Sequence, residues 1–262
     1  MGVLILEKYL KGLSITFKKK QWIDKKIEWL INKMGKDYLE SKQNIALWDV
    51  LKKNEVETIE EFEYIVAFIT KQMDITEKIK FFNIDSNKDH RSMISNIGFG
   101  SYEDNIPGGL YINESGEISI GIRDDLYSAS IEMVAIIAHE LCHLVLLHKM
   151  ALKRNDEKLT DMLTVFFGFG FFSSYAYGYL NQSIYGYIMC SRDLLFGHNN
   201  EDFINNLPST VKDSYLRTKK YFNRNGFPKY FYKYGQFIQS FEKQNIGKIG
   251  AVIQSILGML KR

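Results

Sequence analysis

Hydrophobic positions recur with a helical period through most of the chain and with a strand period in one short region. Residues 21–34 place their apolar side chains on one side of a helix, and Gly35 follows as a stop signal. Residues 59–73 repeat the helical pattern. Residues 78–84 favour a strand, and residues 109–122 predict two strands around a turn at 113–116. The polar residues 36–56 predict a linker between the first helix and the rest.

The chain after this region has a helical pattern almost to its end. Ser128 or Ser130 is a candidate N-cap for a helix that reaches Met150. Asn155 or Asp156 is a candidate N-cap for the next helix, which reaches about Phe172. Further helices are predicted over residues 182–196, 209–223 and 236–261. The predicted fold class is therefore α+β, with a helical N-terminal part, a small and mainly antiparallel sheet, and a largely helical C-terminal half. We expect two parts, a helical segment at residues 1–55 and a larger domain at residues 56–262.

Composition places the chain among ordinary globular proteins, with 45% hydrophobic and 25% charged residues in a total of 262. Two cysteines are too few for a disulfide framework, and the apolar run at residues 3–6 is too short for a signal peptide. We therefore expect a cytoplasmic protein. Residues 162–180 carry no charge and are long enough to span a bilayer. Their glycines, serines and tyrosines favour a buried core helix over a membrane-spanning one, so we expect no membrane association.

The apolar helix predicted over residues 130–150 carries the sequence HELCH at 139–143. Burying His139, Glu140 and His143 costs free energy unless a partner satisfies them. On a helix the two histidines project from one face, one turn apart, where a single metal ion can reach both. Glu140 lies about 100° round the helix and can sit beside the metal without binding it. The competing interpretation is a helix whose histidines pair with carboxylates.

A third metal ligand is available in the next predicted helix. Glu157 and Asp161 are four residues apart and share a helix face. If the chain turns near residues 154–155, Glu157 could complete a zinc site and Asp161 could accept a hydrogen bond from a histidine. Both carboxylates are also common in a solvated first turn of a helix, so this interpretation stays open.

HELCH, together with the sequence EKLTD at 157–161, resembles the gluzincin class of zinc metallopeptidases. Residues 160–170 are also similar to an uncharacterised group of bacterial HExxH proteins. The resemblance implies a zincin-like C-terminal half and one Zn²⁺ per chain, bound by His139, His143 and Glu157. It implies that Glu140 is the general base and that Asp161 orients a ligand. The spacing between the two motifs is shorter than in thermolysin-like enzymes.

These residues predict a hydrolase that cuts a peptide or protein substrate with a zinc-activated water. An oxyanion donor is expected as well, and four residues are candidates: Tyr179, Tyr185, Tyr187 and His198. The predicted strand at residues 116–122 could offer its edge to an extended peptide. His148 faces away from the metal on the helical wheel, and Cys142 is expected to be a small core residue.

The alternative is a non-catalytic binding or regulatory protein with a structural or vestigial zinc site. Residues 211–262 hold eleven basic and two acidic side chains, and residues 212–243 interleave them with aromatic ones, which single-stranded nucleic acid can stack on. However, no nucleic-acid-binding motif is visible, and aromatic residues at mixed spacing are typical of a core. A purely structural zinc site also has no need of Glu140. The sequence does not indicate an oligomeric state.

Overall fold

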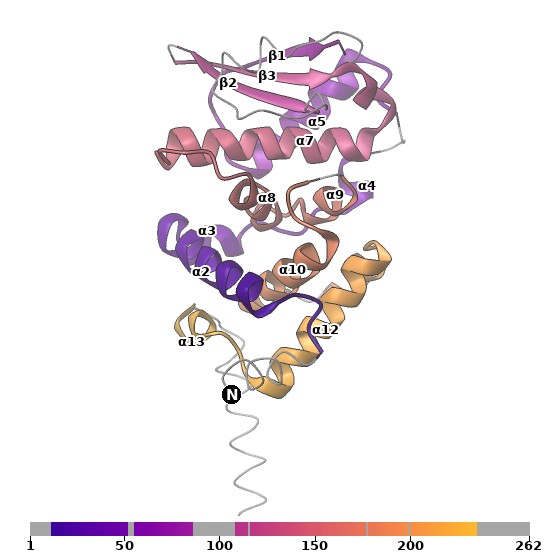
Figure 1. Cartoon of the computed structure of the whole chain (residues 1–262). Helices are drawn as coiled ribbons and strands as arrows, with labels where there is room; N and C mark the ends of the chain where they lie inside the picture. The colour runs from indigo at the N-terminus through magenta and orange to yellow at the C-terminus, as the bar shows by residue number, and fades with distance from the viewer. Residues whose placement is uncertain are drawn as a thin grey trace, which may run out of the picture.

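A small sheet lies on one side of a buried helix, and most of the other helices lie on its other side (Figure 1). The computed structural model describes residues 12–51, 55–85, 108–114, 116–176, 178–198 and 200–234. This arrangement confirms the predicted α+β class. The helix predicted at 236–261 and most of the loop expected at 85–109 lie outside the described residues.

The sheet has three strands in the order β1-β3-β2: β1 Ile79–Ile84, β2 Gly109–Glu114 and β3 Glu117–Arg123. β3 is central because it pairs with β1 on one edge and with β2 on the other. Its isoleucines at 118, 120 and 122 are buried on one face, and Gly116, at φ 86°, allows the tight turn from β2. β3 pairs with β2 antiparallel and with β1 parallel, so the sheet is mixed rather than mainly antiparallel. Since both edges of β3 are paired, it cannot receive a peptide, and the expectation for residues 116–122 is wrong. β2 is the outer strand on that side of the described sheet.

The observed helices agree best with the prediction where apolar residues recur at helical spacing over a long segment. The described α-helices are α2 Phe17–Met34, α3 Lys36–Glu40, α4 Leu47–Val50, α5 Ile59–Gln72, α7 Ser130–His143, α8 Glu157–Phe166, α9 Gly170–Tyr175, α10 Gln182–Phe196, α11 Glu201–Asn205, α12 Ser209–Asn225 and α13 Lys229–Tyr234. A 3₁₀ turn, η1 Asp124–Ser128, precedes α7, and a π-helical segment, η2 Leu144–Lys149, continues it. Ala129, rather than a serine, is the N-cap of α7, so that cap prediction is wrong.

The stretch after α2 is more structured than the predicted linker. α3 and α4 form within it, and Leu39, Ile45 and Val50 enter the same hydrophobic core as α2. The backbone N–H of Ile45 also donates to the carbonyl of Gly168, 2.9 Å away, which ties the stretch to the loop between α8 and α9. Residues 36–51 therefore pack as part of the core.

The apolar run at residues 162–180 is buried, as expected, but it forms two helices instead of one. α8 ends at Phe166 because Gly168 adopts φ 97°, where a Cβ would lie 1.9 Å from the carbonyl oxygen of Gln43. α9 follows at Gly170. Within the described residues, one helical stretch is long and apolar enough to cross a membrane, Ser130–Lys149, and most of it is buried inside the protein. Such burial fits a core helix.

Candidate metal centre

α7 carries both histidines of the HELCH sequence on the face that meets α8. α7 and α8 pack against each other, and β2 lies against α7 as well (Figure 1). His143 and Glu140 are buried, while the side chain of His139 keeps 17% of its surface exposed. His139, Glu140 and His143 form a group that could hold a metal ion. The π-helical segment η2 begins immediately after His143, and such segments are frequent at functional sites.

Three side-chain atoms from the two helices converge on one point. His139 Nε2 lies 3.1 Å from His143 Nε2 and 3.0 Å from Glu157 Oε2. His143 Nε2 lies 3.4 Å from the same carboxylate oxygen. Ligands at tetrahedral angles around a zinc ion, each about 2.0 Å from it, lie about 3.3 Å from one another. The triangle of two imidazole nitrogens and one carboxylate oxygen therefore has the size of one face of a zinc tetrahedron.

The other ring nitrogen of each histidine has a partner on α8. His139 Nδ1 lies 2.9 Å from Asp161 Oδ1, and His143 Nδ1 lies 3.4 Å from Thr160 Oγ1. The Thr160 hydroxyl donates to the backbone carbonyl of Asp156, so its oxygen can accept a hydrogen bond from the Nδ1–H of His143. Each contact presents Nε2 of its histidine toward Glu157. Thr160 had no role assigned from sequence, although its spacing of three residues from Glu157 places it on the same helix face.

Asp161 is itself held in place by the chain that follows α9. Its second oxygen accepts the backbone N–H of Leu180, 3.0 Å away, and the Tyr185 hydroxyl also donates to this carboxylate. Gly178 allows this approach, because a Cβ there would lie 2.9 Å from the Asp161 carboxylate. The carboxylate that contacts His139 is therefore buried and hydrogen bonded at both oxygens.

Glu140 lies beside the triangle, under β2. The backbone N–H of Tyr111 donates to its carboxylate, and a Cβ on Gly109 would lie 2.8 Å from Glu140 Oε1. Burial raises the pKa of Glu140, against the lowering effect of His143 and His139. A carboxylate with a raised pKa, beside the two histidines but outside the triangle that Glu157 completes, suits proton transfer.

The charges at this centre are strongly coupled. Burial alone would lower the pKa of His139, but hydrogen bonds to Asp161 and Glu157 outweigh it and raise that pKa to about 10. Burial would raise the pKa of Glu157, yet hydrogen bonds from His139 and His143 hold it well below its usual value. Without a metal, then, a proton on His139 and the carboxylate of Glu157 neutralise each other, as in the interpretation of histidines paired with carboxylates.

Of the four oxyanion candidates, Tyr179 lies nearest the centre. Its ring stacks on that of His139, with centroids 6.2 Å apart and an interplanar angle of 21°. Tyr185 is buried against Asp161, and the Tyr187 hydroxyl donates to Asp24, 2.8 Å away. His198 lies near Asp193 and the ring of Phe196, on α10.

Two further expectations concern residues outside the centre. His148 lies near Asn113, with 3.4 Å between His148 Nδ1 and Asn113 Nδ2, and it is not part of the metal-binding group. Cys142 is a free, fully buried thiol in the core, as predicted.

The aromatic residues of the basic C-terminal region are mostly used in packing. Phe222, Tyr230 and Phe231 are buried, and Tyr221 and Phe227 pack against the same core. Tyr232, by contrast, is 58% exposed. Most of these rings are therefore used in packing, as expected of aromatic residues at mixed spacing.

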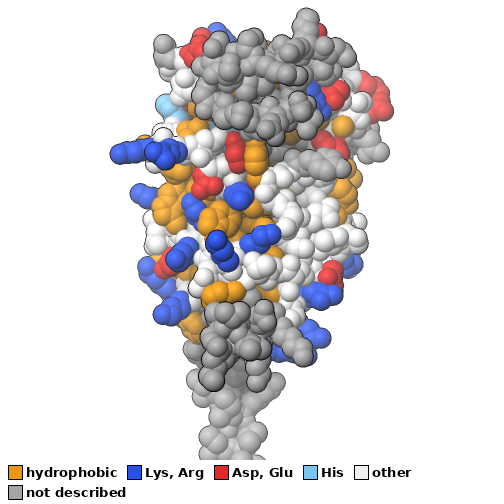
Figure 2. Space-filling model, viewed as in Figure 1, with side chains coloured by type: hydrophobic (Ala, Val, Ile, Leu, Met, Phe, Trp, Pro, Cys, Tyr) orange, Lys and Arg blue, Asp and Glu red, His pale blue; other side chains and the backbone are white. Residues whose placement is uncertain are grey.

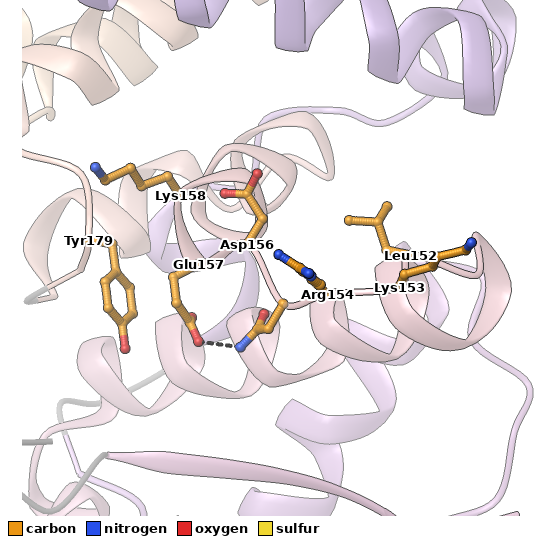
Figure 3. Close-up of a pocket in the computed structure, with 8 residues that line it drawn as sticks. Leu152, Lys153, Arg154, Asp156, Glu157, Lys158 and Tyr179 are labelled. Carbon is orange, nitrogen blue, oxygen red and sulfur yellow. Dashed lines mark hydrogen bonds between the residues drawn. The ribbon is translucent and has the colours of Figure 1, made fainter. Parts of the chain in front are cut away.

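An open pocket of about 530 Å³ adjoins the centre (Figure 3). Figure 3 shows Tyr179 and Arg154 on opposite sides of Glu157. Glu157 thus lines the pocket with one part of its side chain and faces the two histidines with its Oε2. A molecule in this pocket would lie next to any metal bound at the centre.

Comparison of the chain with protein-family models, curated proteins and solved structures finds no match. The gluzincin resemblance therefore rests on the residues themselves. Its coarse part, a His-Glu-x-x-His cluster able to hold a metal ion, is present in the structure.

Proposed function

We propose that the chain is a zinc-dependent metallopeptidase, with one Zn²⁺ bound by His139, His143 and Glu157. The observation that carries this proposal is the triangle of their three atoms, with sides of 3.0, 3.1 and 3.4 Å. The donor set of two imidazoles and one carboxylate is the one used by several catalytic zinc sites, which keep a fourth position open for water. The positions of Asp161 and Thr160 behind the histidines support the same assignment.

A bound zinc ion would lower the pKa of a water to about 7 and polarise the scissile carbonyl. Glu140 accepts the proton of the attacking water and transfers it to the nitrogen of the leaving amine. Tyr179, which lines the adjoining pocket, is the candidate that can donate to the oxyanion.

β2 is the candidate strand for binding an extended peptide. It is the outer strand on its side of the described sheet, and it passes directly over Glu140. A peptide paired with the edge of β2 that faces away from β3 would bring a backbone carbonyl toward the centre by main-chain hydrogen bonds. We also propose a cytoplasmic location, since both described cysteines are free and buried.

The decisive experiment compares the wild-type chain with Glu140→Gln. We expect the variant to keep about one zinc per chain by elemental analysis and to lose peptide hydrolysis by a factor of at least ~100, since it keeps the shape of the side chain but cannot accept the proton. His148→Ala is the matched control and should keep both properties. A zinc-free wild-type chain that takes up no zinc on titration would refute the metal assignment. Hydrolysis by Glu140→Gln at the wild-type rate would refute the assigned base.

A further inference from the structure

The pocket beside the candidate metal centre is lined largely by charged side chains. Its lining residues are Leu152, Lys153, Arg154, Asn155, Asp156, Glu157, Lys158 and Tyr179. They come from the turn between η2 and α8, from the first residues of α8, and from the segment before α10. The pocket therefore combines a loop of basic residues with one wall of the centre.

The two acidic residues of this pocket already have partners. Asp156 accepts a salt bridge from Lys26 of α2, at 2.8 Å, and Glu157 faces the two histidines. Within the described ranges no salt bridge joins Lys153, Arg154 or Lys158 to a carboxylate, and all three side chains are exposed. The pocket is therefore positively charged. Figure 2 shows Lys and Arg side chains gathered over the middle of the face on which α2 and α8 lie in Figure 1.

We infer that this basic pocket binds a carboxylate of the peptide substrate, either an Asp or Glu side chain or the C-terminal carboxylate. The inference rests on the proposed peptidase function and names its substrate class. A guanidinium can bind a carboxylate through two parallel hydrogen bonds, and lysines add attraction as point charges. Because Glu157 and Tyr179 line the pocket and also contact the histidines of the centre, a carboxylate held here places the neighbouring peptide bond beside the candidate metal centre.

The physical character of the pocket sets the size of the effect. Its basic side chains are exposed, so each contributes modestly, and their attraction falls as salt screens it. We expect an acidic peptide to bind roughly tenfold more tightly than a neutral one at low ionic strength, and the difference to shrink at ~0.5 M salt.

The test measures binding rather than turnover. Glu140→Gln, with and without added zinc, is titrated with three short rhodamine-labelled peptides of otherwise identical sequence. One has a central Glu and an amidated end, one has Gln and an amidated end, and one has Gln and a free C-terminal carboxylate. Tighter binding of the first or the third identifies which carboxylate the pocket takes. Equal binding of all three peptides, or no binding, overturns the inference.

A combined variant tests the residues, with Lys153→Ala, Arg154→Ala and Lys158→Ala added together. It should lose the preference and bind all three peptides like the neutral one. The matched control variant removes the same number of lysines and arginines from another region, with Lys220→Ala, Lys229→Ala and Arg224→Ala. It should keep the preference for the acidic peptides. A preference that survives in the combined variant overturns the inference. The inference is also overturned if a short oligothymidylate binds more tightly than the acidic peptides and the combined variant loses that binding.

Failure of this inference and failure of the proposed function give different results. If wild-type enzyme cleaves acidic and neutral peptides equally well, the peptidase proposal stands and the basic pocket has no role in selection. If acidic peptides bind selectively but none is cleaved, the pocket assignment stands and the peptidase proposal fails.

Discussion

At the scale of single residues, the centre separates side chains that would touch a metal from side chains that position them. Glu157 Oε2 lies in the triangle with the two Nε2 atoms, whereas Asp161 and Thr160 each contact an Nδ1 atom on the far side of an imidazole. Loss of a ligand from a three-ligand site removes most of the binding free energy. Loss of a positioning partner typically costs ~10–100-fold in affinity or activity.

We therefore expect an order of damage among four variants. Glu157→Ala should release zinc almost completely. Asp161→Ala should weaken zinc binding ~10–100-fold, Thr160→Val by about tenfold, and His148→Ala should have no effect. Competition with a chromogenic chelator measures these affinities, and circular dichroism checks that each variant is folded. If Asp161→Ala releases zinc while Glu157→Ala retains it, Asp161 is the ligand.

The pKa of His139 leads to an expected dependence of zinc affinity on pH. In the metal-free chain that pKa lies at about 10, so the ring is protonated at pH 7 and zinc must displace the proton on Nε2. Up to about pH 10, the apparent zinc affinity should therefore increase about tenfold with each unit of increase in pH, because fewer chains then carry the competing proton. Calorimetric titration in buffers of different ionisation enthalpy counts the protons released. Release of none would show that His139 is not a ligand.

At the scale of secondary-structure elements, the sequence predicted well the parts of the molecule that depend on local pattern. α10 was predicted at its observed bounds, α5 within one residue, and the turn between β2 and β3 at its place. The break after α8 could not be predicted, because Gly168 is required by its approach to the Gln43 carbonyl, more than a hundred residues away. The central position of β3 likewise depends on pairing with β1, which local alternation does not reveal.

For the candidate centre, helix geometry predicted which histidines share a face, because that follows from spacing within one helix. It did not predict the contact of Thr160 with His143, which depends on how α7 and α8 pack. It also did not indicate which tyrosine lies near His139, since Tyr179 reaches the centre from the irregular segment between α9 and α10.

The approach of β2 to α7 supplies a test at this scale. A Cβ on Gly109 would lie 2.8 Å from both Glu140 Cγ and Oε1 and 2.6 Å from Ile136 Cγ2, so Gly109→Ala must displace the carboxylate or the strand. We expect hydrolysis to fall ~10–100-fold, because a displacement of about 1 Å suffices for such losses, while zinc content stays at the wild-type level. Asn113→Ala, at the exposed end of β2, is the control. Wild-type hydrolysis by Gly109→Ala would mean that β2 does not constrain Glu140.

At the scale of the whole molecule, the N-terminal helix is joined to the centre by packing and by charge. Ile23, Ile27 and Leu30 of α2 are completely buried and belong to one hydrophobic core with α7, α8 and α10. Lys26, on the same helix, makes its salt bridge to Asp156, the residue whose side chain caps α8 next to Glu157. The predicted boundary at residue 55 stays a prediction, but these contacts lead us to expect that α2 unfolds together with the centre.

Ile27→Ala tests this coupling. Removing a fully buried isoleucine side chain should lower the free energy of unfolding by ~2–4 kcal/mol. Urea titrations of the zinc-loaded variant, followed by far-ultraviolet circular dichroism and by zinc release to a chromogenic chelator, should show both transitions shifted to lower urea and still coincident. Lys25→Ala, on the exposed side of α2, should shift neither. If part of the helical signal is lost early while zinc release keeps its wild-type midpoint, residues 1–55 form a separate unit and the salt bridge to Asp156 does not couple them to the metal.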